Sequence, residues 1–209
     1  MVSDPPAPDT TDITLKPIIK NRVPQNVRFE IDDAESPWLF EKASFDLIHI
    51  RHLMGAIQDW RQFIAEAFKF VKPGGYIEVA EYEMKLFSDD GTLSESSTVM
   101  RWYDLVDNAT VVVGRDFRIA PHIAPILADA GFVDVHHQVY KLPIGSWAAD
   151  PKLKEIGAFV MLVAEEGFEG FGIKLFTHVC GMTFAESKEL IAEAKRNAMN
   201  WRVHSYCKQ

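Results

Sequence analysis

Few side chains in this sequence have the type and spacing for acid–base or metal chemistry. His52 follows the strongly apolar residues 45–51, and a histidine at a strand end can transfer protons near neutral pH. The alternative is a partly buried histidine with a structural role only. His136 and His137 lie in a stretch expected to be extended, so their side chains face opposite ways and cannot share a metal ion. No His, Cys and Asp cluster has ligand spacing, and we predict no metal site.

Two apolar stretches joined by a helix are expected to position His52. Residues 45–51 (FDLIHIR) and 76–82 (YIEVAEY) are typical of buried strands in a parallel sheet. Between them, apolar residues recur with helical spacing, namely Trp60, Phe63, Ile64, Ala67, Phe68 and Val71. Asp59 is the expected N-cap, and Pro73-Gly74-Gly75 ends the helix. This strand–helix–strand crossover predicts an α/β fold with a mainly parallel sheet.

Further elements are predicted on both sides of this crossover. Strands are expected over residues 27–31, which alternate apolar and polar, and over residues 132–140. Helices are expected over residues 94–113, 119–130 with Gly131 as the stop, 151–163 after Asp150 as cap, 168–180 and 184–203. Thr183 and Glu186 have the spacing of a capping box at the start of the last helix.

The composition is that of a soluble globular protein, with 47% hydrophobic and 25% charged residues among 209. The formal net charge of -8 argues against nucleic acid or an anionic membrane as a partner. Cys180 and Cys207 suggest no disulfide framework, and the sequence has neither a signal peptide nor an apolar run long enough to span a membrane. We expect a cytoplasmic protein, with nuclear entry left open.

Four motifs in a fixed order resemble class I S-adenosylmethionine-dependent methyltransferases. They are residues 26–35 (NVRFEIDDAE), 44–53 (SFDLIHIRHL), 72–79 (KPGGYIEV) and 130–135 (AGFVDV). Residues 142–147 (LPIGSW), 150–157 (DPKLKEIG) and 169–171 (EGF) are similar to the fungal group around the velvet-complex regulator of secondary metabolism. The resemblance implies a Rossmann-like sheet of order 3-2-1-4-5-7-6, and the cofactor S-adenosylmethionine across the carboxyl ends of its strands.

The resemblance also implies which residues bind the cofactor. Asp12 matches the acid that holds the ribose hydroxyls, and Asp33 and Ala34 match the pair that meets the adenine. Arg51 and His52 match positions that border the cofactor and the substrate. For Asp33 the alternative is a loop acid that caps a helix start, and for Asp12 a solvated acid. No catalytic residue is assigned.

The sequence departs from the family pattern at both ends. No glycine-rich turn precedes Asp12, so we expect the first strand and its glycine loop to be lacking. At the other end the sequence stops at residues 204–209, where the family continues into its last strand, so we expect that strand to be lacking too. The expected organisation is a disordered tail over residues 1–11 and an incomplete domain over residues 12–209, with a helical lid insertion at about 148–182. Open sheet edges would then favour self-association.

Two kinds of function remain open from the sequence. The first is methyl transfer from S-adenosylmethionine to a small molecule or a protein, with weak cofactor binding by this chain alone. The second is a catalytically inactive relative that acts by protein association or binds a small ligand. A third possibility is that the chain is an incomplete product or a fragment of an active enzyme. Whether the chain is an enzyme is left undecided at this stage.

Overall fold

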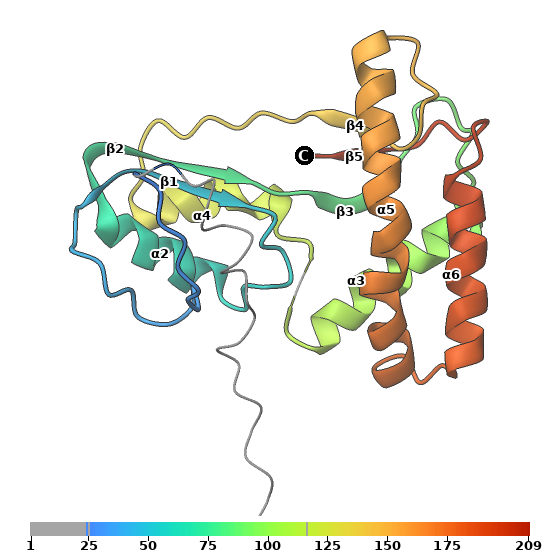
Figure 1. Cartoon of the computed structure of the whole chain (residues 1–209), viewed down its shortest axis with the longest axis horizontal. Coiled ribbons are helices and arrows are strands. Elements are labelled where there is room, and N and C mark those ends of the chain that lie inside the picture. The colour runs from blue at the N-terminus through green and yellow to red at the C-terminus, as the bar shows by residue number, and fades with distance from the viewer. Residues whose placement is uncertain (1–23, 25, 116) are drawn as a thin grey trace, which may run out of the picture. The chain divides into compact units, whose positions relative to one another are not determined.

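The computed structural model describes residues 24, 26–115 and 117–209 (Figure 1). The chain divides into two compact units, Met1–Ser36 and Pro37–Gln209, and each is described by itself. The described residues of the first unit contain no helix or strand, so the strand predicted over residues 27–31 is wrong. A strand needs a neighbouring strand for its backbone N–H and C=O groups, and residues 27–31 pair with none among the described residues of their unit.

Two parallel strands joined by a helix begin the second unit. β1 (Phe45–Arg51) pairs in parallel with β2 (Val71–Ala80), with Ile50 opposite Val79. α2 (Trp60–Phe70) connects the two strands. The predicted crossover is therefore confirmed, but residues 71–75, predicted to finish the helix and turn, already belong to β2. Among the described residues β1 has only β2 as a neighbour, which leaves its outer edge open.

Two helices pack against each other beside this strand pair. α2 begins at its predicted cap, because the Asp59 side chain accepts a hydrogen bond from a first-turn N–H. Its buried side chains are Trp60, Phe63, Ile64, Ala67 and Phe70. α4 (Ile123–Ala130) packs against α2 and ends at Gly131 (φ 108°), as predicted. It starts later than expected, after the 3₁₀ turn η2 (Ala120–His122), because Pro125 fits only the first turn of an α-helix.

A small antiparallel sheet lies next along the chain. β3 (Glu83–Phe87), β5 (Tyr206–Lys208) and β4 (Lys141–Pro143) pair in that order. The chain was expected to lack the last strand, and the structure places a three-residue strand near its end. The strand predicted over residues 132–140 is wrong, because this stretch has no strand assignment and pairing begins only where β5 lies alongside.

Three helices form the main core of the second unit. α3 (Thr98–Val112) and α6 (Phe184–Ala198) confirm the predicted helices, and α6 carries the predicted capping box. The two helices expected between residues 151 and 180 are one helix of 28 residues, α5 (Pro151–His178). Glycines do not break it, because Phe168 and Phe176 are buried in the core along its second half.

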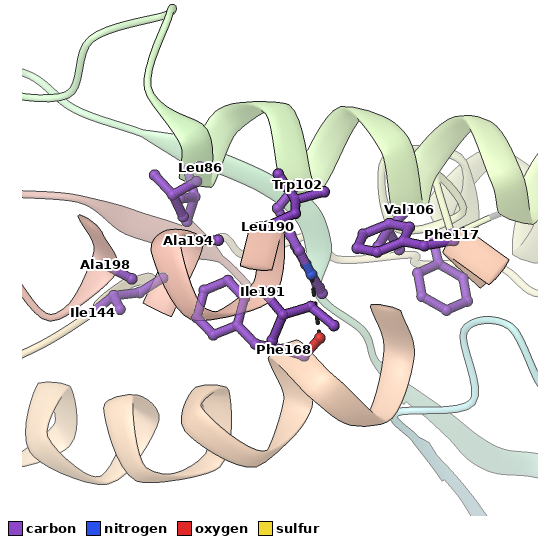
Figure 2. Packing of buried hydrophobic residues seen from close by; sticks show 12 residues of the cluster. Leu86, Trp102, Val106, Phe117, Ile144, Phe168, Leu190, Ile191, Ala194 and Ala198 are labelled. Atoms are coloured by element: carbon purple, nitrogen blue, oxygen red, sulfur yellow. Dashed lines mark hydrogen bonds between the residues drawn. The ribbon is translucent and has the colours of Figure 1, made fainter. Parts of the chain in front are cut away.

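One hydrogen bond ties two of these helices together inside the core. Figure 2 shows the Trp102 indole N–H donating to the carbonyl oxygen of Phe168 at 3.2 Å. Val99, Val106, Ile191 and Ala194 are buried around this contact. In the described part of the chain, no helix is both long and apolar enough to cross a membrane.

Candidate functional site

The carboxyl ends of β1 and β2 bring polar side chains together. Arg51 is the last residue of β1, and His52 follows it with a left-handed φ of 55°. The N–H of His52 donates to the carbonyl oxygen of Ala80 at 3.1 Å, which extends the strand pairing by one bond. Glu81 and Tyr82 follow β2 at the same edge. In open α/β sheets this edge is where ligands bind.

Glu81 fixes the turn that follows His52. Its side chain is buried, and the residue is only 6% exposed. One carboxylate oxygen accepts the N–H of Leu53 at 2.7 Å, and the other accepts the N–H of Met54 at 3.2 Å. Burial raises the pKa of Glu81, although the two backbone hydrogen bonds oppose that change by favouring the charged form. The Glu81 carboxyl group therefore holds the backbone that follows β1 in place.

The His52 ring is held between an aromatic ring and an amide. It stacks on Tyr82, with the centroids 4.2 Å apart and 19° between the planes. Its Nε2 lies 3.2 Å from the Gln209 side-chain nitrogen, which can only donate, so Nε2 accepts and the ring proton is on Nδ1. Burial lowers the pKa of His52, and the charge of Arg51 lowers it further. The ring is therefore neutral at pH 7.

Two other titratable side chains, Tyr82 and Cys207, are also neutral at pH 7. Burial raises the pKa of the Tyr82 hydroxyl above its ordinary value. Burial also raises the pKa of the Cys207 thiol to about 11. Neither group is a ready nucleophile or base near pH 7. His52 could serve as a base only by exchanging its bond to Gln209 for one to a substrate.

Asp33 and Ala34 belong to the first unit. The Asp33 carboxylate accepts a hydrogen bond from the N–H of Glu35 at 3.0 Å and another from the hydroxyl of Ser36 at 3.2 Å. The side chain thus closes a turn over residues 33–36, and no helix follows it among the described residues of this unit, so Asp33 does not cap a helix start. Asp12 lies outside the described residues.

The structure adds three residues that the sequence interpretation did not select, namely Glu81, Tyr82 and Gln209. The first two are the last residues of the predicted strand 76–82, and the rule that ligands bind at the carboxyl ends of parallel strands could have found them. Gln209 could not have been found, because it reaches His52 across 157 positions of sequence. Among the described residues no group of three or more His, Cys, Asp or Glu side chains could hold a metal ion.

Comparisons with known proteins identify the family. A family model described as "Methyltransferase domain" matches residues 4–137. Methyltransferase pytC of Aspergillus terreus is 35% identical to this chain over 91% of the chain and 59% of its own length. The laeA protein of Emericella nidulans is 28% identical over 93% of this chain and 52% of its own length. It is named both a protein-methionine methyltransferase and a secondary metabolism regulator. The chain thus spans between about half and three-fifths of these relatives.

One solved structure is also similar. It is the Haemonchus contortus phosphoethanolamine N-methyltransferase 2 in complex with phosphomonomethylethanolamine and S-adenosylhomocysteine. The match has 22% sequence identity and a TM-score of 0.40, and it covers 85% of this chain and 34% of that protein. The family model spans well over half of the 209 residues, and this chain therefore belongs to the methyltransferase domain family.

Proposed function

We propose that this chain serves S-adenosylmethionine-dependent methyl transfer to a small molecule or a protein. The observation that carries the proposal is the meeting of Arg51, His52, Glu81 and Tyr82 at the carboxyl ends of two parallel strands. A ligand at this edge would meet a flat stacked ring pair, a positive guanidinium and a buried carboxyl group. A nucleoside offers the complementary flat surface and polar edge.

The proposed binding roles follow the family positions. Arg51 and His52 border the cofactor and the acceptor, Asp33 accepts from the adenine amine, and Ala34 lies beside the ring. Asp12 is proposed to hold the ribose hydroxyls. Because Asp33 already accepts two hydrogen bonds within its turn, it would have to use a remaining lone pair of its carboxylate for the amine.

The described residues fit one end of the cofactor only. A glycine-rich turn after a strand would cradle the charged methionine end with its backbone N–H groups. The sequence has a single G-x-G, Gly170-Phe171-Gly172, and it lies inside α5. We therefore propose that this chain forms the nucleoside and acceptor side of the site, with weak affinity for S-adenosylmethionine when alone.

The neutral groups around His52 favour an acceptor that needs no base. S-adenosylmethionine supplies a methyl group on a sulfonium sulfur, and an acceptor with a free lone pair can take it by in-line displacement. A thioether qualifies, and it becomes a sulfonium as the cofactor's sulfur becomes a thioether. A protein methionine, the acceptor named for the Emericella relative, has this chemistry. What the protein then supplies is alignment of the reacting atoms.

A second candidate function is protein association or small-ligand binding without catalysis. The lack of a glycine-rich turn at the end of any described strand favours it, as does the open edge of the β1–β2 pair. Either function is proposed to operate in the cytoplasm or the nucleus. In either case, residues 148–182, which contain α5, are proposed to act as a lid.

Isothermal titration of the full chain with adenosine and with S-adenosylhomocysteine tests the first proposal. We expect both ligands to bind in the millimolar range, on the order of 4 kcal/mol of binding free energy. The variant His52→Ala should bind both more weakly, whereas the control His49→Ala, at an exposed position on β1, should bind like the wild type. Micromolar affinity for S-adenosylhomocysteine would contradict the proposal that this chain forms only the nucleoside and acceptor side of the site. No binding of adenosine would favour the second function.

A further inference from the structure

The turn that follows His52 has two supports in the second unit. It comprises residues 53–57, and the N–H groups of its last two residues donate to the carbonyl oxygen of its first at 2.9 and 3.3 Å. The first support is the Glu81 carboxylate, which accepts two other N–H groups of the turn. The second is the connection between α3 and η2, of which residues 113–115 and 117–119 are described.

The second support is a close contact between Phe117 and Gly55. Gly55 has a left-handed φ of 74°, and a Cβ atom there would lie 2.0 Å from Cε1 of the Phe117 ring and 2.9 Å from two of its other carbons. The ring thus lies directly against the Gly55 backbone, where any side chain would collide with it. Next to this contact, the Arg115 guanidinium donates a hydrogen bond to the carbonyl oxygen of Ala56. The connection therefore contacts two consecutive residues of the turn.

The Phe117 ring is also part of the main core. It is only 5% exposed and belongs to the buried cluster that Figure 2 shows. It packs edge to face with Phe171 of α5, with the ring centroids 5.6 Å apart and 86° between the planes. A buried ring in a close-packed core has little freedom to move apart from its neighbours. The same ring therefore contacts both the turn after His52 and the helix proposed to act as a lid.

We propose that Phe117 is a positioning residue that couples the position of α5 to the turn after β1, and so sets the place of His52. The inference rests on the proposed function, in which His52 borders the cofactor and the acceptor. Because Gly55 lies three positions from His52 in the same turn, displacement of the turn would shift the His52 ring from its stack on Tyr82. Coupling is reciprocal, so a ligand that needs His52 in place would also favour the present position of α5.

The pKa of His52, followed by NMR of its ring protons in the full chain, reports on the turn without any ligand. Burial and the charge of Arg51 hold this pKa below its ordinary value of 6.5. In Phe117→Leu the turn loses a support and the His52 ring becomes more exposed, so the pKa should rise toward 6.5. The matched control is Phe176→Leu, because Phe176 is 0% exposed in the same core and its ring packs on Trp102. This control should lose stability in denaturant without a change in the His52 pKa.

The substitution Gly55→Ala tests the same contact from the side of the turn. Its matched control is Gly91→Ala, because Gly91 has nearly the same φ, 73°, and no atom within 4 Å of its Cβ position. Both substitutions strain the backbone, but only Gly55→Ala should raise the pKa of His52. The double variant Gly55→Ala/Phe117→Leu should lose less stability than the two single losses added together, because leucine leaves room for the new methyl group.

Isothermal titration with adenosine separates the positioning role from the proposed function. If the turn keeps its present form about a tenth of the time in Phe117→Leu, adenosine should bind about tenfold more weakly than to the wild type. Phe176→Leu should bind adenosine like the wild type.

Two results would overturn the positioning role, even if the wild type binds adenosine. They are an unchanged His52 pKa in both Phe117→Leu and Gly55→Ala, and an equal rise of that pKa in Phe176→Leu. A rise confined to Phe117→Leu and Gly55→Ala would support the role. If the wild type then failed to bind adenosine, that result would count against the proposed function alone.

Discussion

The close approach of α5 to β4 depends on Gly157, which has no side chain. A Cβ atom at Gly157 would lie 2.2 Å from the carbonyl oxygen of Gly145 and 3.2 Å from the Cβ of Pro143. The same two backbones share a hydrogen bond, in which the N–H of Gly145 donates to the carbonyl of Gly157 at 3.0 Å. Gly170, in the same helix, has no atom within 4 Å of its Cβ position. The substitutions Gly157→Ala and Gly170→Ala therefore make one chemical change in two environments.

The two substitutions should shift stability in opposite directions. At Gly170, alanine gains about 0.5–1 kcal/mol, because it loses less backbone freedom on folding than glycine. At Gly157 the same gain is offset by overpacking of about 1–3 kcal/mol, near the upper end because the opposing atom is backbone. The two variants should then differ by roughly 2–3 kcal/mol, which is about 4–12 °C in melting temperature for a chain of this size.

Thermal unfolding followed by circular dichroism measures the difference directly. Exchange of the Gly145 amide should also speed up in Gly157→Ala, because α5 can no longer hold the chain after β4 at its present distance. Equal melting temperatures for the two variants, or a more stable Gly157→Ala, would refute this account of how α5 is seated. That outcome would also mean that the contact of α5 with β4 does not stabilise the sheet that contains β5.

Three further predictions follow from buried groups. Burial raises the pKa of Glu81 above its unfolded value of 4.5, so between the unfolded and folded pKa values the folded chain binds more protons than the unfolded chain. In that pH range the free energy of unfolding of the wild type should fall with rising pH, relative to that of Glu81→Gln. Denaturant titrations that show the opposite slope would contradict this prediction. Trp102→Phe loses the hydrogen bond to Phe168 and should lower the free energy of chemical unfolding by about 1–3 kcal/mol. The control Trp201→Phe, at an exposed position, should lower it by less than about 0.5 kcal/mol. Equal losses in the two variants would count against the core contact. The Cys207 thiol, with a pKa raised to about 11, should react slowly with iodoacetamide at pH 7 and faster up to pH 11, a trend that flat rates would disprove.

Local sequence signals predicted the elements whose cause is local. The crossover over residues 45–80 follows from apolar runs and a helical period, and the cap at Asp59 and the stop at Gly131 follow from single residues. The capping box at Thr183 is equally local. For the caps at Asp59 and Thr183, the atoms that decide the structure lie within four residues of one another.

Long-range contacts account for what the sequence did not predict. The pattern of residues 27–31 and 132–140 suits strands, but pairing depends on neighbours that the pattern cannot supply. Two helices were predicted over residues 151–163 and 168–180, yet burial of Phe168 and Phe176 holds α5 together as one helix. At the site, the contact of His52 with Gln209 arises only because β5 folds back alongside Tyr140.

We propose that the described residues contact the nucleoside end of S-adenosylmethionine and not its charged methionine end. Saturation-transfer NMR with S-adenosylhomocysteine tests that claim atom by atom. We expect strong transfer to the adenine protons, little to the methionine-chain protons, and loss of the adenine signal in His52→Ala but not in His49→Ala. Equal transfer along the whole ligand, or none to the adenine, would contradict it.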